Sequence, residues 1–152
     1  MTNFFIANQE IITRLVLAMV LGMVIGIERY LAHKTAGMRT YSLVAMGSAL
    51  FIIISEFVAH AYAGSSGLNP LHIAAAVITG MGFLGAGLMI HQDMKIVGLT
   101  SASGLWVASG IGMAVGFGLY SLSIIATILT LFIFIILWFI EKKVIDRMEG
   151  KK

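Results

Sequence analysis

Apolar residues run almost without interruption through the chain, in five stretches separated by short polar joints. The stretches cover residues 11–27, 41–63, 71–90, 98–119 and 121–140. A bilayer core of about 30 Å needs roughly 20 apolar residues at helical rise, with about 17 as the lower limit. The runs are continuous and lack the alternation of barrel strands. The sequence therefore predicts an all-α integral membrane bundle of five transmembrane helices.

The composition supports this class of protein. The chain is 59% hydrophobic and 11% charged, with a mean hydropathy of +0.99, whereas an average soluble domain is about 25% charged. Five spans leave too few residues for a second domain, so we expect one transmembrane domain over residues 1–152. Residues 1–10 lack the basic start and cleavage site of a secretory signal, which predicts that the first stretch is a retained span.

The positions of Lys and Arg predict how the chain crosses the membrane. Nine of the ten basic residues fall in the joints after the first and third stretches and in the tail at residues 141–152; the tenth, Arg14, lies inside the first stretch. Cytoplasmic segments carry an excess of Lys and Arg. We therefore predict an outside N-terminus and a cytoplasmic C-terminus. The same placement accounts for the pI of 9.4, and we expect no nucleic-acid binding.

Glycines recur at close spacing on three spans, where small residues let helix backbones approach each other in lipid. These glycines are Gly22 and Gly26 on the first span, Gly80, Gly82, Gly85 and Gly87 on the third, and Gly104, Gly112 and Gly116 on the fourth. We expect these three spans to form the tightly packed centre, and the glycine-free fifth span to face lipid.

Residues 80–85 also match the dinucleotide-binding pattern G-x-G-x-x-G. That pattern binds a cofactor only between a strand and a helix of a soluble βαβ unit. A position in the middle of a membrane span excludes this reading, and we expect no cofactor.

Ionisable residues lie inside two spans. Arg14 follows Glu10 by one helical turn, and Glu56 precedes His60 by one turn. Because consecutive spans are antiparallel, Arg14 and Glu56 fall in the same third of the membrane and could meet. An intramembrane carboxylate is by default a functional hypothesis, here ion or proton handling. The alternative is an arginine paired with Glu10 at the interface. So few ligands do not make a metal site, and none is expected.

A denser polar group falls on the predicted cytoplasmic side. Its candidate functional residues are Glu28, Arg29, Arg39, Thr40, Thr100 and Ser101. Helices that begin at Thr40 and Thr100, capped by hydroxyls, would point two N-termini at this face and could hold an anion or a partner's carboxylate. Alternatively, these are positive-inside residues with caps and ion pairs, such as Glu28 with Arg39, and need no ligand.

Several motifs in these segments resemble the MgtC/SapB family of bacterial membrane proteins. The motifs are Gly22-x-x-x-Gly26-Ile27-Glu28-Arg29, Ala36-Gly37-Met38-Arg39-Thr40, Ile73-Ala74-Ala75, residues 79–87 and residues 97–106. The resemblance implies a small helical inner-membrane protein tied to growth in low magnesium and to acid or host stress. In some members it implies inhibition of the rotary ATP synthase. Members were once labelled magnesium transporters, a role that the resemblance does not secure.

The chain departs from the family at two places. Many relatives carry Arg and Gln in an R-I-A-A-Q stretch where this chain has His72 and Ala76, so a site that uses those polar side chains is in doubt. Many also have a soluble C-terminal α/β domain. We expect this chain, which ends at Lys152, to be a short form without it.

Two classes of function stay open. The first is a regulatory protein that binds another membrane protein through its helix faces, and that could also form a homo-oligomer. The second is a cation transporter or channel with magnesium as the implied substrate. Magnesium prefers octahedral oxygen ligands and gives up its water reluctantly, whereas only Glu56 is plainly inside the membrane. No nucleophile, base and orienting group occur together and no ATP-binding motif exists, so we expect no enzyme activity.

Overall fold

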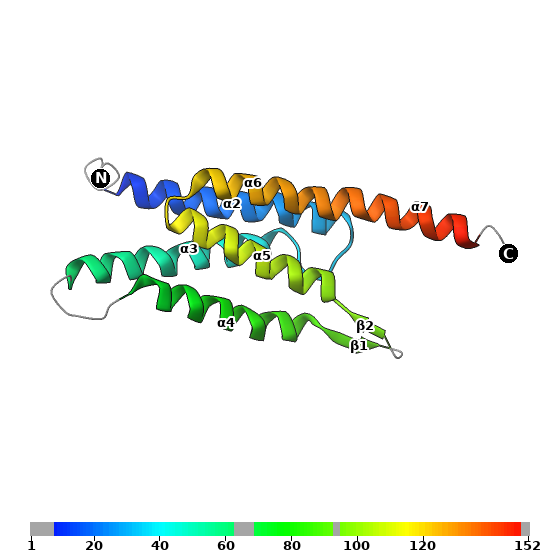
Figure 1. Ribbon diagram of the computed structural model, residues 1–152, viewed down its shortest axis with the longest axis horizontal. Coiled ribbons are helices and arrows are strands. Elements are labelled where there is room, and N and C mark those ends of the chain that lie inside the picture. Colours follow the sequence, from blue (N-terminus) through cyan, green and yellow to red (C-terminus); the bar gives the residue numbers. More distant parts are fainter. Residues whose placement is uncertain (1–7, 63–68, 93–94, 150–152) are drawn as a thin grey trace.

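A computed structural model describes residues 8–62, 69–92 and 95–149 of the chain. Its helices are α2 (Gln9–Leu31), α3 (Met38–Ala61), α4 (Pro70–Leu88), α5 (Leu99–Gly116) and α6 (Tyr120–Phe132), the last continued by the π-helical segment η1 (Ile133–Leu137) and α7 (Trp138–Glu149). Five helical runs are long and apolar enough to cross a membrane, the fifth of them from Tyr120 to Val144. The predicted all-α bundle of five membrane-spanning helices is confirmed (Figure 1).

The joint between α4 and α5 is a β-hairpin, which the sequence did not predict. Strand β1 (Ile90–Gln92) pairs antiparallel with β2 (Lys95–Val97), and the hairpin projects beyond the start of α5 (Figure 1). Gly98 then leads into α5 with φ at 96°, in the left-handed region that glycine tolerates. A Cβ at this position would also strike the carbonyl oxygen of Leu88.

The helix starts agree with the sequence at α4 and differ at α3 and α5. Pro70 opens α4, and the side chain of Asn69 accepts a hydrogen bond from the Leu71 amide at 2.9 Å, as a helix cap should. By contrast, glycines precede the first helical residues of α3 and α5. The prediction that Thr40 and Thr100 begin and cap these helices is wrong, because the chain turns into each helix earlier. Both threonines lie in the first helical turn.

Helices α2, α3 and α5 form the packed centre, with α4 at the edge against α5 and α3 (Figure 1). Gly22 and Gly26 of α2 and Gly104, Gly112 and Gly116 of α5 face α3, whereas a Cβ on Gly110 of α5 would meet nothing within 4 Å among the described residues. A Cβ on Gly22 would lie 2.5 Å from the Tyr41 carbonyl oxygen, and a Cβ on Gly112 would strike the Ala45 carbonyl oxygen. Gly26 and Gly116 abut the same helix. Close backbone approach is what small residues allow in lipid, so these glycines set the core of the bundle.

The prediction that the third span lies in this centre is wrong. Among the described residues, a Cβ on Gly80, Gly82 or Gly87 would have no neighbour within 4 Å, and one on Gly85 would lie 3.7 Å from the Ala102 Cβ. Only 11% of the most apolar window of α4 is buried, against 61% of that of α5. Small residues mark where a helix can be approached closely, but not whether the neighbour belongs to the same chain.

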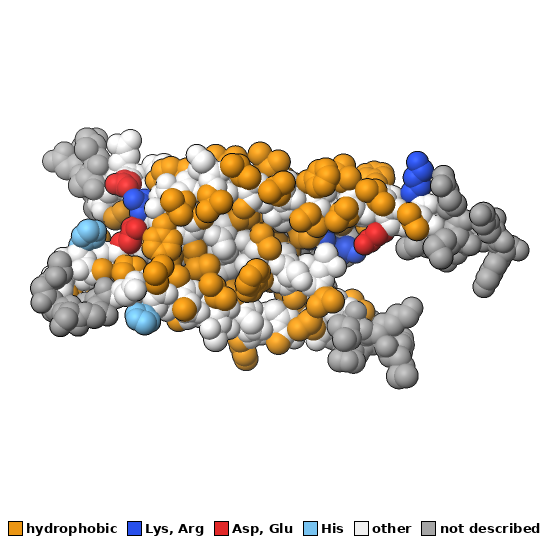
Figure 2. Space-filling model, in the orientation of Figure 1, with side chains coloured by type: hydrophobic (Ala, Val, Ile, Leu, Met, Phe, Trp, Pro, Cys, Tyr) orange, Lys and Arg blue, Asp and Glu red, His pale blue; other side chains and the backbone are white. Residues whose placement is uncertain are grey.

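Helix α6 is peripheral and carries the bulky surface expected of a lipid-facing helix. Its exposed side chains include Leu122, Ile125, Ile128, Leu129 and Phe132. Its buried hydroxyls donate to carbonyl oxygens of their own helix: Ser123, Thr127 and Thr130. Figure 2 shows hydrophobic side chains over the middle of the visible face, with charged side chains towards its two ends. This distribution suits a membrane-embedded middle and two wet ends.

Candidate functional site

Charged side chains of the helices gather in two groups at opposite ends of the bundle. We call the end where α2 begins and α3 ends the outer end, and the end where α2 finishes and α3 begins the inner end. These names follow the orientation predicted from Lys and Arg, which stays a prediction.

Arg14 organises the outer end. Its Nη1 donates to Glu56 Oε2 at 2.9 Å and to the carbonyl oxygen of Gly116 at 2.6 Å, and its Nη2 donates to Glu10 Oε1 at 2.5 Å. The carbonyls at a helix C-terminus lack intrahelical partners and carry partial negative charge. Arginine's rigid fork can serve several acceptors at once. One guanidinium therefore ties α2 to α3 and to the last turn of α5.

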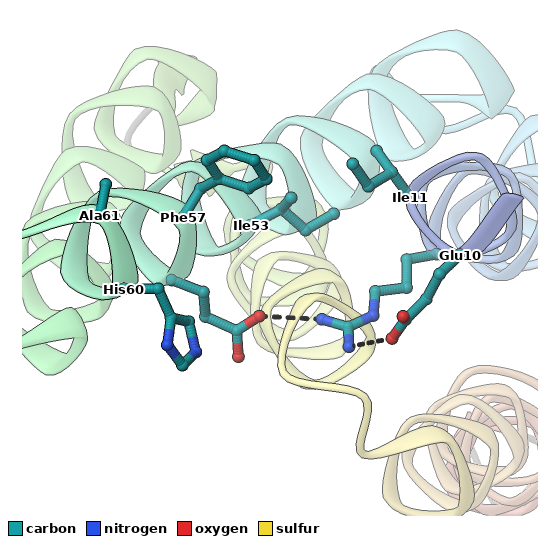
Figure 3. Close-up of a pocket in the computed structure, with 8 residues that line it drawn as sticks. Glu10, Ile11, Ile53, Phe57, His60 and Ala61 are labelled. Carbon is teal, nitrogen blue, oxygen red and sulfur yellow. Dashed lines mark hydrogen bonds and ion pairs between the residues drawn. The ribbon is translucent and has the colours of Figure 1, made fainter. Parts of the chain in front are cut away.

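A cavity of about 530 Å³ opens beside this group, between α2 and α3. Its lining residues are Glu10, Ile11, Arg14, Ile53, Glu56, Phe57, His60 and Ala61. Figure 3 shows the His60 ring directed to the opposite side of α3 from the Phe57 side chain. Within the described residues, no three His, Cys, Asp or Glu side chains are placed to hold a metal ion. The cavity combines an apolar wall with an ion pair already joined at its edge.

Arg29 organises the inner end in a different way. Its Nη2 donates to Glu28 Oε1 at 2.6 Å and its Nε donates to the second oxygen of the same carboxylate. The residue is 3% exposed. Its guanidinium carbon lies 3.6 Å from the centroid of the Phe134 ring, a cation–π contact that strengthens when water is excluded. This arginine is thus held by one carboxylate and covered by an aromatic ring.

Side chains from α3 and α5 complete the inner end. The Tyr41 hydroxyl is buried and donates to the Ser101 carbonyl oxygen at 3.2 Å. A Cβ on Gly104 would strike this hydroxyl and would lie 2.7 Å from Phe134 Cζ. Gly104 therefore leaves the space in which the tyrosine and phenylalanine side chains sit.

The six candidate residues predicted for the cytoplasmic side fall into a packed group and an exposed group. Glu28, Arg29 and Ser101 belong to the packed inner end, whereas Arg39, Thr40 and Thr100 are exposed. The expected pair of Glu28 with Arg39 is wrong, because Arg29 binds both oxygens of that carboxylate.

Sequence reasoning missed Phe134 altogether. It lies within an unbroken apolar run, and nothing in that run distinguishes a ring that covers an arginine from one that faces lipid. On the outer side, Arg14 and Glu56 meet as the antiparallel arrangement indicated.

These features define a multi-pass helical membrane protein. At each end of the bundle, one buried or half-buried arginine is paired with carboxylates. A family model described as the MgtC family matches residues 15–143, and the chain belongs to that family. The resemblance noted from the motifs is confirmed.

Named relatives come from several bacteria. The chain is 45% identical over 128 residues to the "Putative magnesium transporter YhiD" of Escherichia coli K12. The matched region covers 83% of this chain and 60% of the relative. It is 38% identical over 111 residues to "Protein MgtC" of Brucella abortus, a match that covers 73% of this chain and 44% of the relative. It is 40% identical over 127 residues to "Protein SrpB" of Synechococcus elongatus, a match that covers 78% of this chain and 69% of the relative. The matched region thus spans about 60% of the Escherichia coli relative. No solved structure matches the chain.

Proposed function

We propose that the chain is a regulatory protein of the bacterial inner membrane, linked to magnesium homeostasis or to acid and host stress. It acts by binding another membrane protein through its helix faces. The link to magnesium comes from the name of the YhiD relative and from the resemblance to the family. The proposal assigns no catalytic reaction to the chain.

The open face of α4 is the observation that carries this proposal. Helix α4 exposes Leu71, His72, Ile73, Ile78 and Leu84, and beside them a group of mostly small residues around one large ring. This group is Ala75, Ala76, Thr79, Gly80, Gly82, Phe83, Ala86 and Gly87. We call this set the α4 face. Phe83 is 82% exposed, and the flanking glycines have no described neighbour. Elsewhere in this chain, at Gly22 and Gly112, a glycine marks a backbone contact between helices. The α4 face therefore suits close contact with a helix of another protein.

The other peripheral helix provides a comparison within the molecule. Helix α6 exposes large aliphatic and aromatic side chains, which lipid tails solvate as well as any protein surface does. Since both helices lie at the edge of the bundle, position alone does not explain why the α4 face consists mostly of small residues when the exposed surface of α6 consists mostly of large ones. A requirement for close helix contact on α4 does explain it.

Exposed polar residues at the inner end extend the proposed contact surface. Arg39, Thr40 and Thr100 are exposed where α3 and α5 begin, and Tyr41 joins these two helix starts through its bond to Ser101. A guanidinium with a planar fork suits a carboxylate on a partner. The rotary ATP synthase, which the family resemblance implies for some members, is one candidate partner, and a second copy of this chain is another.

A pair of glycine substitutions tests the proposal. A Cβ on Gly82 would meet no described neighbour within 4 Å, so Gly82→Leu adds bulk to the α4 face. Gly110→Leu makes the same change on α5, at a position that is open by the same measure. We expect both variants to accumulate in the membrane. In a host that depends on this protein for growth at low magnesium, Gly82→Leu should abolish growth and Gly110→Leu should retain it. Full growth with Gly82→Leu would contradict the proposal.

Transport of a cation is the second candidate, because the outer cavity holds two carboxylates and one relative is named a putative magnesium transporter. Against it, Arg14 already binds both Glu10 and Glu56, whereas magnesium needs several oxygen ligands. We expect the purified protein in liposomes to take up no magnesium. Uptake that disappears on Glu56→Gln would instead favour transport.

A further inference from the structure

A smaller cavity lies between the outer half of α3 and the start of α4. Its volume is about 190 Å³, and it shares no lining residue with the cavity beside Arg14. Large apolar side chains from both helices line it, and they are between 41% and 53% exposed: Phe51, Ile54, Val58 and Ile73. In a bilayer, exposed apolar side chains of membrane-spanning helices face lipid tails. The cavity is therefore a groove open to lipid, which we call the α3–α4 groove.

Ser55 brings a buried polar group to this apolar wall. The residue lines the groove and is 7% exposed, and its hydroxyl oxygen is buried without a hydrogen-bond partner among the described residues. The other polar residue of the described lining, Asn69, is exposed, and its side-chain oxygen already caps α4. A buried hydroxyl without a partner is unfavourable. The groove thus combines apolar walls with one hydrogen-bond donor that is still to be satisfied.

Other helical hydroxyls of this chain show how Ser55 differs. Five of them donate to the carbonyl oxygen four residues earlier, at 2.7 to 2.9 Å: Thr13, Thr79, Ser103, Thr127 and Thr130. Such bonds are a common way for Ser and Thr to satisfy themselves inside a helix. The equivalent acceptor for Ser55 is the Phe51 carbonyl, which it does not use. An acceptor from outside the chain would satisfy this hydroxyl.

The depth of Ser55 indicates which acceptor is available. Ser55 directly precedes Glu56, so it lies at the level of the Arg14–Glu56 pair, where polar side chains begin at the outer end. Phospholipids place their polar, interfacial groups at the boundary of the hydrocarbon core, and their acyl ester carbonyls join these groups to the apolar tails. An ester carbonyl accepts a hydrogen bond and donates none. It therefore complements a single donor beside an apolar groove.

We propose that the α3–α4 groove binds an acyl chain of a membrane phospholipid, whose ester carbonyl accepts a hydrogen bond from the Ser55 hydroxyl. A serine hydroxyl turns between staggered positions, and Ser55 directs it to the groove that the residue lines. No residue of the α4 face lines this groove, so the lipid and a partner protein occupy separate sites. The lipid site goes beyond the regulatory role proposed above and does not depend on it.

Two photoreactive phospholipids test the lipid site. They carry the same diazirine-bearing chains, joined by ester bonds in one and by ether bonds in the other, so that only the first offers carbonyl oxygens. The purified protein is irradiated in nanodiscs that contain equal amounts of both, and the adducts, which differ in mass, are mapped by mass spectrometry. Peptides of α6 report contact with bulk lipid, where we expect equal labelling by the two. At the groove we expect a preference of about fivefold for the ester lipid, the contribution of one neutral hydrogen bond.

Two serine variants assign this preference. Ser55→Ala should lower the ester preference at the groove to the value at α6. Ser103→Ala is the matched control, because it removes a hydroxyl that bonds within its own helix, and it should keep the fivefold preference. Equal labelling of the groove by the two lipids in the unaltered chain, or no labelling there, would overturn the proposal, and this holds even if Ser55→Ala fails to fold. A preference that persists in Ser55→Ala would overturn it as well.

Discussion

Helices α4 and α5 both carry closely spaced glycines, yet they place them in opposite surroundings. In α5, a side chain on Gly104, Gly112 or Gly116 would collide with another helix and Gly110 is open, whereas three of the four glycines of α4 face open space among the described residues. The same sequence feature therefore lies at an interface within the chain in α5, and we propose that in α4 it lies at an interface with a partner. This difference is the basis for assigning the α4 face to a partner.

The two helices also differ in how their ends are held. Helix α5 is tied at its inner end by Tyr41 through the Ser101 carbonyl, and at its outer end by Arg14 through the Gly116 carbonyl. Its middle adds a hydrogen bond between Ser48 and Ser109 at 2.9 Å. Hydrogen bonds between membrane helices are worth about 1 kcal/mol each. Helix α5 is thus a fixed element around which the bundle forms, and α4 is attached to it at the edge.

The largest effect should come from filling the contact between α5 and α3. Gly112→Leu forces a side chain into the Ala45 backbone, and overpacking of this kind costs about 3 kcal/mol or more where backbone cannot yield. We expect a strong loss of folded protein and a lower unfolding temperature in detergent. Gly110→Leu is the matched control and should unfold near the temperature of the unaltered chain. Equal behaviour of the two variants would remove the distinction between packed and open glycines.

An intermediate effect should come from the outer tie to α5. Arg14→Lys keeps the charge but loses the fork that reaches Glu56 and the Gly116 carbonyl together. Hydrogen bonds to charged groups contribute about 2 kcal/mol, so we expect the free energy of unfolding to fall by about that amount. Arg39→Lys makes the same change at an exposed residue and should alter stability by less than about 0.5 kcal/mol.

The Arg39→Lys variant also tests the proposed contact surface. Because its stability should be unchanged, loss of growth at low magnesium would point to recognition by the guanidinium fork. Full growth would show that Arg39 is not part of the contact surface, and would not affect the assignment of the α4 face.

The smallest effect should come from the inward side of α4. A Cβ on Gly85 would lie 3.7 Å from the Ala102 Cβ, with no other described neighbour within 4 Å, so we expect the edge helix to move outward and accommodate Gly85→Leu. We expect a cost of about 1 kcal/mol, at the low end of overpacking. Gly87→Leu, with no described neighbour, should cost nothing measurable. Thermal unfolding of both variants in the same detergent gives the comparison, and a loss at Gly85 as large as that at Gly112 would place α4 in the core after all.

Local features of the sequence were sufficient for the spans and for the outer ion pair. Length and continuous apolarity determine which segments can cross a bilayer. A spacing of one helical turn placed Glu10 beside Arg14, and the antiparallel direction of consecutive spans placed Glu56 within reach of Arg14. These inferences need only helix geometry and the alternation of direction between consecutive spans.

The packing partners could not be read in the same way. Helix α3 belongs to the centre because Ala45, Ser48 and Ala49 present a small surface to its neighbours, a signal that a search for glycines alone overlooks. The position of the Phe134 ring depends on tertiary contacts between apolar surfaces that are chemically interchangeable. Such contacts are determined by the packing of the whole bundle, and no local pattern in the sequence indicates them.

Site-specific photo-crosslinking in native membranes tests the central claim most directly. A photoreactive residue in place of Phe83 lies on the α4 face, and one in place of Leu129 lies on the lipid-facing side of α6. We predict a discrete product between the chain and a membrane protein from position 83, its loss when Gly82→Leu is added, and no such product from position 129. Lipid adducts alone at both positions, or the same protein product from both, would contradict the account.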